Sequence, residues 1–327
     1  MLVEFARASL LQKAKQQPQR VQQALDKIKT DGLLTTVDAI RNRLDQPLAM
    51  GYSNLGEVTA VGEGVDGFQV GDRVASNGPH AEVVHVPRNL CVKVPDSVED
   101  EQAAFAVLAS IPLQGIRLLK PELGETVVVY GLGLLGLLAV QLLAASGVNV
   151  VGIDLDPDRL SLAERFGATP LNAREDDPVD LVRSLVGDDG ADAVLITASA
   201  KSDRILRNAA SIARKRGRIV LVGDVTTEFD RAEFYQKELS LLVSCSYGPG
   251  RYDPRYEQQG IDYPLAYVRW TEQRNLEAVV ELMAGGKLDP LPLVTHRIAH
   301  TQANEGYDRL VEDSSDLAIL LQYPASN

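Results

Sequence analysis

Gly131, Gly133 and Gly136 form a Gly-x-Gly-x-x-Gly pattern that follows a β-prone apolar run and precedes an apolar helical stretch. A strand, glycine turn and helix of this kind can bind the diphosphate of a dinucleotide, because backbone N–H groups at the start of the helix face the ligand. The pattern alone is weak evidence, and a purely structural turn is the alternative. Asp154 strengthens it, because it lies eighteen residues beyond Gly136, where a carboxylate can accept hydrogen bonds from a ribose.

Each residue type has a separate role in the predicted cofactor site. Gly131 permits the tight turn, Gly133 lets the diphosphate approach the backbone, and Gly136 lets the helix pack closely. Asp154 favours NAD, because its carboxylate would repel the 2′-phosphate of NADP. Arg159 is either a cover for the adenosine or a solvated helix residue. The predicted cofactor contacts are Gly131, Leu132, Gly133, Leu134, Leu135, Gly136, Asp154, Arg159, Thr197, Ala198, Val222, Gly223, Ser246 and Tyr247.

A second candidate site is the segment around Arg251, which reads Tyr247-Gly-Pro-Gly-Arg-Tyr-Asp. A guanidinium in a loop restrained by glycine and proline suits an anionic substrate group, because it can donate two parallel hydrogen bonds to a carboxylate or phosphate. The alternative is a rigid linker that packs on the following helix. An aromatic surface suited to stacking a sugar or base comes next in the chain, formed by Tyr263, Tyr267, Arg269 and Trp270.

The sequence contains no recognisable metal-ligand pattern. Its four histidines do not occur in His-x-x-x-His spacing, and Cys91 and Cys245 have no nearby thiol partner. We therefore expect no metal. Each histidine is interpreted as a surface or capped residue, and His80 is the strongest exception because it adjoins Gly78-Pro79.

These residues need a parallel sheet to position them, and the sequence predicts one. From residue 126 onwards, apolar strands alternate with helical segments, which is the pattern of a doubly wound α/β fold. Residues 126–153 carry no charge and are long enough to cross a membrane, but β-branched runs and glycines indicate a buried strand, helix and strand instead. The predicted strands cover 126–130, 148–153, 169–172, 191–197, 218–223 and 239–245, and the predicted helices 134–146, 157–166, 177–187 and 202–214.

The predicted fold is α/β, with a doubly wound parallel Rossmann sheet, a smaller β-rich catalytic domain and an N-terminal helical segment. Apolar residues at helical spacing place that segment at 1–49. We expect the dinucleotide-binding domain at 112–248 and the β-rich domain at 50–111 and 249–327. Outside the sheet we expect strands at 56–61, 73–76, 81–86 and 317–322 and helices within 100–119 and at 272–284.

The composition excludes several classes of protein. The chain has 327 residues, of which 45% are hydrophobic and 24% charged, and this indicates a folded protein. Its net charge of −12 would repel phosphate backbones, so we expect no nucleic-acid partner. No apolar signal segment follows Met1, and two cysteines cannot build a disulfide framework. We therefore expect a cytoplasmic protein without membrane contact.

The β-rich region and the glycine pattern together resemble the medium-chain alcohol dehydrogenase superfamily. The segments that carry this resemblance in the β-rich region are Gly62-Glu-Gly-Val65, Gly71-Asp-Arg-Val74 and Ala81-Glu-Val-Val-His-Val-Pro87. The resemblance covers residues 50–322 and implies hydride transfer to or from a nicotinamide in a cleft between two domains. The opening Glu4–Lys13 and the run Tyr247–Pro254 resemble a zinc-free bacterial subgroup that is often encoded as the first half of a two-part oxidoreductase and associated with sugar genes.

The resemblance also implies catalytic positions and a departure from the family's zinc site. Zinc-dependent members have Gly-His-Glu where this chain has Gly51-Tyr52-Ser53, and a ligand cysteine of the family would fall near Ser110. The first ligand cysteine would lie before Met1, in a strand region that we expect the chain to lack. Without zinc, side chains must hold or supply the proton. The candidate catalytic residues are Tyr52, Ser53, His80, Ser110 and Arg251, of which Tyr52 is the first.

The leading hypothesis is an NAD-dependent, zinc-independent oxidoreductase that acts on a small polar alcohol or carbonyl, with an anionic or sugar-like substrate. Tyr52 would hydrogen-bond the substrate oxygen, unless it is only a packing tyrosine. One alternative is a quinone or enoyl reductase, although such enzymes generally prefer NADPH. Another is a cofactor-binding but inactive regulatory or assembly protein. In that case a separate oxidoreductase domain would be the partner that carries out the chemistry. A homodimer is the other assembly that we consider.

Overall fold

The computed structural model describes residues 49–313 and 315–324. Contacts between Cα atoms divide the chain into two compact units, one formed by residues 52–296 and the other by 1–51 with 297–327. The helical prediction for residues 1–49 therefore falls almost wholly outside the described residues. The predicted domain boundary at residue 111 lies inside a continuous helix, α6 (Ala106–Leu119), and the division into domains stays a prediction.

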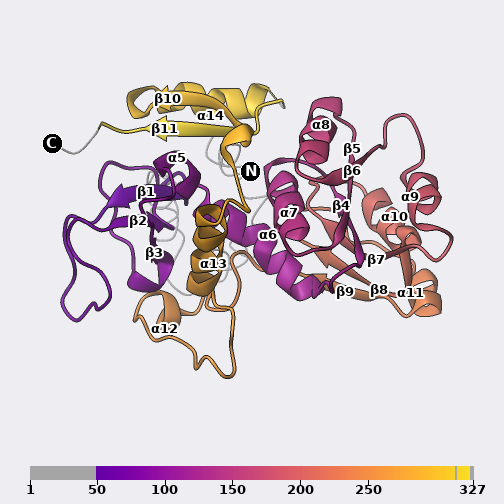
Figure 1. Cartoon of the computed structure of the whole chain (residues 1–327), viewed down its shortest axis with the longest axis horizontal. Coiled ribbons are helices and arrows are strands. Elements are labelled where there is room, and N and C mark those ends of the chain that lie inside the picture. Colours follow the sequence, from indigo (N-terminus) through magenta and orange to yellow (C-terminus); the bar gives the residue numbers. More distant parts are fainter. Residues whose placement is uncertain (1–48, 314, 325–327) are drawn as a thin grey trace, which may run out of the picture. The chain divides into compact units, whose positions relative to one another are not determined.

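The larger unit contains a six-stranded parallel sheet, as the alternating pattern predicted (Figure 1). Its strand order is β6-β5-β4-β7-β8-β9, which is the order 3-2-1-4-5-6 of dinucleotide-binding sheets. The order reverses between β4 and β7, so a crevice is expected at their carboxyl ends. The strands are β4 (Thr126–Tyr130), β5 (Asn149–Asp154), β6 (Ala168–Asn172), β7 (Ala191–Ile196), β8 (Ala213–Leu221) and β9 (Ser240–Val243).

Helices cover both faces of this sheet, which is why its central strands are apolar on both sides. The α6 helix, α7 (Leu134–Ala145) and α8 (Pro157–Arg165) pack on one face. The other face is covered by α9 (Pro178–Val186), α10 (Arg204–Ile212) and α11 (Arg231–Lys237). Among the described residues, no helix is both long and apolar enough to span a membrane.

An aspartate followed by a proline marks the start of two of these helices, α8 and α9. Asp156 and Asp177 each accept a hydrogen bond from the backbone N–H two residues on, at 2.9 Å in both cases, and proline follows each aspartate. An aspartate cap satisfies a free N–H group, and proline suits the first helical position because its missing N–H would have no partner there.

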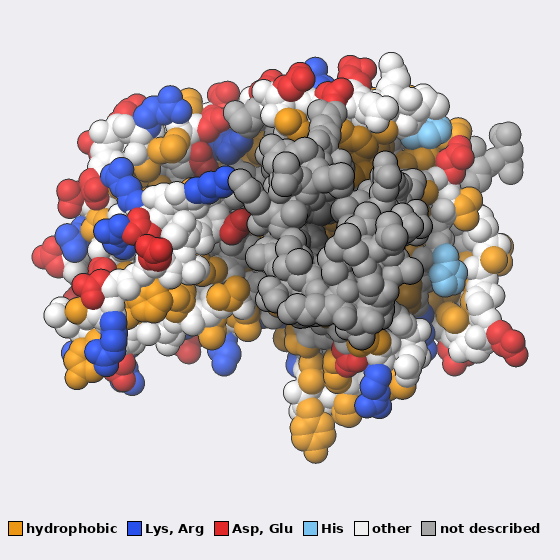
Figure 2. Space-filling view, turned by 180° about the vertical axis from the view of Figure 1, so that it is seen from behind, with side chains coloured by type: hydrophobic (Ala, Val, Ile, Leu, Met, Phe, Trp, Pro, Cys, Tyr) orange, Lys and Arg blue, Asp and Glu red, His pale blue; other side chains and the backbone are white. Residues whose placement is uncertain are grey.

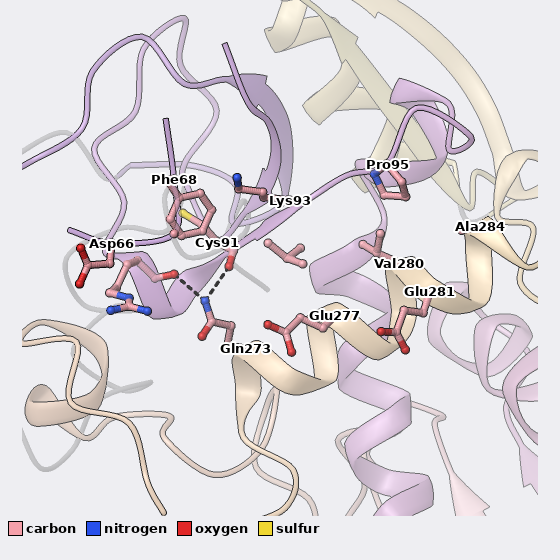
Figure 3. Close-up of a pocket in the computed structure, with 13 residues that line it drawn as sticks. Asp66, Phe68, Cys91, Lys93, Pro95, Gln273, Glu277, Val280, Glu281 and Ala284 are labelled. Atoms are coloured by element: carbon pink, nitrogen blue, oxygen red, sulfur yellow. Dashed lines mark hydrogen bonds between the residues drawn. The ribbon is translucent and has the colours of Figure 1, made fainter. Parts of the chain in front are cut away.

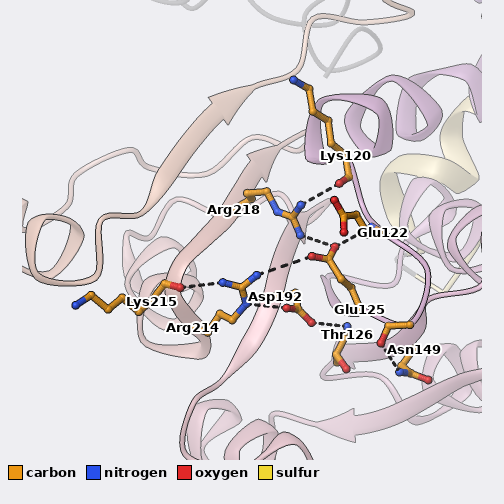
Figure 4. Close-up of polar contacts among 10 residues, drawn as sticks. Lys120, Glu122, Glu125, Thr126, Asn149, Asp192, Arg214, Lys215 and Arg218 are labelled. Carbon is orange, nitrogen blue, oxygen red and sulfur yellow. Dashed lines mark hydrogen bonds and ion pairs between the residues drawn. The ribbon is translucent and has the colours of Figure 1, made fainter.

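A polar network joins the amino-terminal ends of β4, β7 and β8 (Figure 4). Asp192 accepts a hydrogen bond from the Thr126 backbone N–H at 2.8 Å and one from Arg214 at 2.7 Å, while Arg218 pairs with Glu125. Burial alone would raise the pKa of Asp192, but these hydrogen bonds outweigh it and hold the pKa below its usual range. The network fixes strand register at the sheet edge opposite the predicted cofactor site.

The β-rich part of the larger unit is a three-stranded antiparallel sheet of β1 (Asn54–Glu57), β2 (Arg73–Ser76) and β3 (Cys91–Lys93). The expected strand at 81–86 is wrong, because these residues form no strand and the Val83 side chain is 78% exposed. β-branched residues favour a strand only where neighbouring strands can pair and pack with it. Two short helices, α5 (Asp100–Ala103) and α12 (Pro254–Glu257), and the predicted α13 (Glu272–Ala284) complete this part.

The carboxyl-terminal residues form β10 (Val294–Ala299), α14 (Ala303–Glu312) and β11 (Ala318–Gln322), with β10 and β11 paired in a two-stranded sheet. Gly306 of α14 is buried, and a Cβ there would lie 3.4 Å from Ile319 and 3.5 Å from Ile298. Glycine therefore lets this helix pack closely on the two strands.

The face of the molecule in Figure 2 carries acidic and basic side chains side by side. Among the described residues on this face, Lys and Arg do not join into the continuous basic stripe that is typical of nucleic-acid-binding proteins. The described part of this face therefore offers no continuous basic surface to a phosphate backbone.

Candidate active site

The glycine turn between β4 and α7 has the shape that its sequence predicted. Gly131 has φ +99°, and a Cβ there would lie 2.6 Å from the Ala198 backbone. A Cβ at Gly136 would lie 2.0 Å from the Gly131 carbonyl oxygen. By contrast, a Cβ at Gly133 would meet no atom within 4 Å. Glycine at 131 and 136 therefore closes the turn, whereas Gly133 faces open space at the start of α7.

The carboxyl ends of β7 and β8 lie against this turn. The Thr197 hydroxyl donates to the Gly131 carbonyl at 2.5 Å, and the Thr197 and Ala198 N–H groups both donate to the Tyr130 carbonyl at 3.0 Å. A Cβ at Gly223 would lie 2.0 Å from the Ala198 carbonyl oxygen. The predicted contacts from three strands thus meet at one sheet edge. Val222 lies beside Gly223, and its N–H donates to the Ile196 carbonyl at 2.9 Å.

Asp154 lies at the end of β5 and is bound to the glycine turn itself. One carboxylate oxygen accepts the Leu132 N–H at 2.6 Å, and the other accepts the N–H groups of Leu155 at 2.7 Å and Asp156 at 3.1 Å. A carboxylate can accept about four hydrogen bonds, so acceptor capacity remains for a ribose hydroxyl. The half-buried Arg159 lies 3.7 Å from Asp156. Leu134 and Leu135, both half-buried, form the first turn of α7.

Two tyrosines from distant parts of the chain meet after the last strand of the sheet. The rings of Tyr52 and Tyr247 have centroids 6.4 Å apart. The amide of Asn77 donates to the Tyr52 carbonyl at 2.8 Å and to the Tyr247 hydroxyl at 3.1 Å. Burial raises the pKa of both phenols. Asn77 carries no functional signal in the sequence, because an asparagine before Gly78-Pro79 resembles an ordinary turn residue.

The other predicted catalytic residues have different surroundings. The Ser53 hydroxyl donates to the Ala104 carbonyl at 2.6 Å. Ser110 is fully buried, and its hydroxyl donates to the Val107 carbonyl at 2.6 Å. His80 is exposed. Tyr52 is therefore the predicted proton donor whose hydroxyl is least engaged with the backbone, since no hydrogen bond of that hydroxyl occurs among the described residues.

Arg251 is held by its own loop rather than presented as a free cation. Its guanidinium pairs with Glu257 at 2.5 Å and lies 5.2 Å and 4.2 Å from the ring centroids of Tyr247 and Tyr252. Tyr247 is buried, while Ser246 before it has φ +47° and Gly248 after it φ +111°. The loop is thus sharply bent, and an anionic substrate group would have to compete with the Glu257 carboxylate.

A cavity of about 420 Å³ lies elsewhere in the larger unit, between α13 and the segment that leads into β3 (Figure 3). The Gln273 side chain donates to the Arg88 and Cys91 carbonyls at 2.9 and 3.0 Å at its edge. None of the predicted site residues lines this cavity. The candidate site residues are therefore those of the glycine turn at the sheet edge and the tyrosine pair that follows β9.

Two domain families match the sequence. The alcohol dehydrogenase GroES-like domain matches residues 27–96, and the zinc-binding dehydrogenase domain matches residues 135–259. The chain belongs to the medium-chain alcohol dehydrogenase-like superfamily. It is an oxidoreductase, and the family's cofactor is NAD or NADP.

Several named relatives align with most of this chain. It is 25% identical to the sorbitol dehydrogenase of Bacillus subtilis, over 86% of this chain and 82% of that protein. A probable D-xylulose reductase A of Arthroderma otae is 26% identical over 82% of this chain and 79% of that protein. Among solved structures, alcohol dehydrogenase TADH from Thermus sp. ATN1 superposes with a TM-score of 0.71, at 26% identity over 84% of both chains.

The described residues of this dehydrogenase fit a dinucleotide but do not fit zinc. The dinucleotide fits because Gly133 faces open space at an uncapped helix start, beside the ordered Asp154 carboxylate. Zinc does not, because no three His, Cys, Asp or Glu side chains of residues 49–313 and 315–324 are grouped to hold a metal ion. The absence of zinc from the protein stays a prediction.

A buried carboxyl group that no sequence pattern indicated lies beneath the Arg251 loop. Glu272 is fully buried at the start of α13, and neither of its carboxyl oxygens has a hydrogen-bond partner among the described residues. Its backbone N–H donates to the Pro249 carbonyl at 2.9 Å. Burial, and then the neighbouring Glu257, raise the pKa of Glu272 to about 8, although Arg251 opposes the shift. The group is therefore protonated at neutral pH.

We predict that Glu272→Gln gains stability relative to the unaltered protein as the pH rises. Between the ordinary pKa of 4.5 and about 8, the folded protein keeps a proton that the unfolded chain releases, so its stability falls as the pH rises through that window. Glutamine removes this dependence. Urea unfolding at pH 5 and pH 8.5 should show the difference between the two proteins growing by about 4 kcal/mol.

The matched control is Glu281→Gln, an exposed position on the same helix, which should show no such growth. A stability difference between Glu272→Gln and the unaltered protein that is equal at both pH values would show that Glu272 has an ordinary pKa.

Proposed function

We propose that this chain is an NAD-dependent, zinc-independent oxidoreductase that interconverts a small polar alcohol, of the sugar-polyol class, and its carbonyl compound. The observation that carries the proposal is the Asp154 carboxylate, which three backbone N–H groups hold beside the glycine turn. Relatives named sorbitol dehydrogenase and D-xylulose reductase support the substrate class. A cytoplasmic location and a homodimer or partner oxidoreductase domain stay predictions.

The cofactor, when bound, supplies or accepts a hydride at its nicotinamide. The glycine turn and the first N–H groups of α7 would hold its diphosphate, and Asp154 would accept hydrogen bonds from its adenosine ribose. Because the carboxylate is already fixed by backbone donors, it cannot turn away from an added 2′-phosphate without losing those bonds. A carboxylate fixed in this way favours NAD over NADP.

Tyr52 is the proposed proton donor to the substrate oxygen. Burial raises the pKa of its phenol, so the hydroxyl keeps its proton at neutral pH and can donate a hydrogen bond to a carbonyl oxygen. As negative charge develops on that oxygen during reduction, the donated hydrogen bond strengthens. Asn77 holds the Tyr52 backbone and the Tyr247 hydroxyl together, and so acts as a positioning residue for this pair.

We predict that NADH binds more tightly than NADPH and that Asp154→Asn narrows the gap. The substitution keeps the size of the side chain and removes the charge that repels a 2′-phosphate. Fluorescence titration with both cofactors measures the two affinities. Asp158→Asn, which removes an exposed carboxylate four residues on, should leave both affinities unchanged. Tighter binding of NADPH by the unaltered protein would refute the assignment of NAD.

We predict that Tyr52→Phe lowers kcat for a reducible polyol-derived ketone such as D-xylulose by about a hundredfold, because it removes the proton donor. NADH affinity and thermal stability should change little, since the ring and its packing stay. Tyr235→Phe, at a tyrosine that is 71% exposed, serves as the control. Unchanged turnover in Tyr52→Phe would exclude Tyr52 as the donor.

We predict that purified protein contains well under one zinc per chain and keeps its activity in the presence of a chelator. The reason is that the described residues offer no group of metal ligands at the candidate site. Elemental analysis and assays with a chelator measure the two quantities. Stoichiometric zinc, with activity lost on chelation and restored by zinc, would contradict zinc independence.

A panel of polyols, ketoses, quinones and enoyl compounds with NADH and NADPH separates the proposed function from its alternatives. Turnover of a quinone or enoyl substrate with NADPH, without turnover of polyols, would indicate a reductase of that kind. NADH binding without turnover of any substrate would indicate an inactive regulatory or assembly protein. The Ser53 and Ser110 hydroxyls each donate a hydrogen bond to a backbone carbonyl. If the chain turns over a substrate, Tyr52 is therefore the expected proton donor.

A further inference from the structure

Trp270 lies between two arginine side chains, outside the candidate active site. The guanidinium carbon of Arg117, on α6, lies 3.2 Å from the centroid of the indole ring, and that of Arg269 lies 3.8 Å from it. Stacked guanidinium groups occupy the ring surface that a sugar or base would need. The aromatic surface expected from the sequence is therefore unsuited, at Trp270, to stacking such a ligand.

The two guanidinium groups have no carboxylate partner in the part of the chain that the structure describes. Among the described residues, neither Arg117 nor Arg269 forms an ion pair within 4 Å, although the nearby Arg251 pairs with Glu257 and Arg274 with Asp262. Glu277 is the acidic residue whose charge interacts with Arg269, but the two make no ion pair. Two neighbouring cations therefore lie here without a carboxylate of the described residues in contact with either of them.

The surroundings of Arg117 hold its guanidinium in place and disfavour its charge. Its Nε donates to the side-chain oxygen of Asn275 at 2.6 Å, and Asn275 is fully buried and donates in turn to the Tyr247 carbonyl at 2.8 Å. Burial, and then the neighbouring Arg269, lower the pKa of Arg117 to about 10. An anion bound here would offset the repulsion between the two cations.

We propose that Arg117 and Arg269 bind the phosphate group of a small ligand beside Trp270. Guanidinium groups match phosphate because they donate several hydrogen bonds in a planar fork, and two of them can neutralise a phosphate dianion. Arg117 has its Nε fixed by Asn275, and its two terminal nitrogens have no hydrogen-bond partner among the described residues. These nitrogens are the donors available to the anion. The site does not depend on the proposed dehydrogenase activity.

Tryptophan fluorescence tests the proposal directly, because Trp270 is the single tryptophan of the chain. Inorganic phosphate and a phosphomonoester, glycerol 3-phosphate, are titrated separately into the unaltered protein, with sodium chloride at matched ionic strength as the reference. We expect a saturable change in emission with either phosphate compound and none with chloride. Tighter binding of the ester would indicate that an organic phosphate is the ligand, and equal binding that free phosphate suffices.

Arg117→Gln and Arg269→Gln should each weaken phosphate binding about tenfold or more, since each removes one charge-assisted contact. Arg117→Lys keeps the charge without the planar fork and should recover part of the affinity. Arg231→Gln is the matched control, because Arg231 also lies over an aromatic ring, 5.0 Å from the centroid of Tyr235, but belongs to another part of the chain. This substitution should leave phosphate binding unchanged. Circular dichroism and thermal unfolding show whether each variant is folded.

Three results would overturn the proposal. One is a fluorescence response to phosphate that is absent, or equal to the response to chloride. Another is unchanged phosphate affinity in folded Arg117→Gln and Arg269→Gln. The third is a fluorescence change that follows protein concentration without phosphate and abolishes the response to phosphate, since this would show that a second copy of the chain covers the site.

Discussion

The close approach of backbone atoms around the β4–α7 turn is the constraint on which the candidate site depends. A side chain at Gly131 would collide with the Ala198 backbone, and one at Gly136 or Gly223 would collide with a carbonyl oxygen at 2.0 Å. These contacts bring the ends of β4, β7 and β8 together. They also leave the start of α7 open at Gly133, so the same packing that completes the sheet edge exposes N–H groups to an anion.

Asp154 joins this turn to the neighbouring strand through a charge. Its carboxylate accepts one N–H from the turn, at Leu132, and two from the start of the next loop. Hydrogen bonds between a carboxylate and backbone N–H groups are stronger than those between neutral groups. The side chain that is proposed to select the cofactor is therefore also a structural part of the turn that holds it, which links cofactor choice to local stability.

Two asparagines connect the β-rich part of the larger unit to the loop after β9. Asn77 bridges Tyr52 and Tyr247, and Asn275 binds the Tyr247 carbonyl while it holds Arg117. The loop also covers Glu272, a carboxyl group that is buried without a hydrogen-bond partner among the described residues. Near the tyrosines, the connecting hydrogen bonds thus come from the neutral amides of two asparagines. Around Arg251, by contrast, the guanidinium is paired with the Glu257 carboxylate.

The sequence by itself determined the parallel sheet and the glycine turn, and it singled out Asp154 at the end of the next strand. These depend on local patterns, since apolar strands alternate with helices and the three glycines stand at fixed spacing along the chain. It did not determine the strand at 81–86, because strand formation needs a pairing partner, and Val83 is exposed instead. Only the tertiary structure decided that Asn77 joins Tyr52 to Tyr247, that Arg251 pairs with Glu257, and that Glu272 is buried. Such contacts join residues that are distant in the chain, or depend on burial, and no sequence spacing records them.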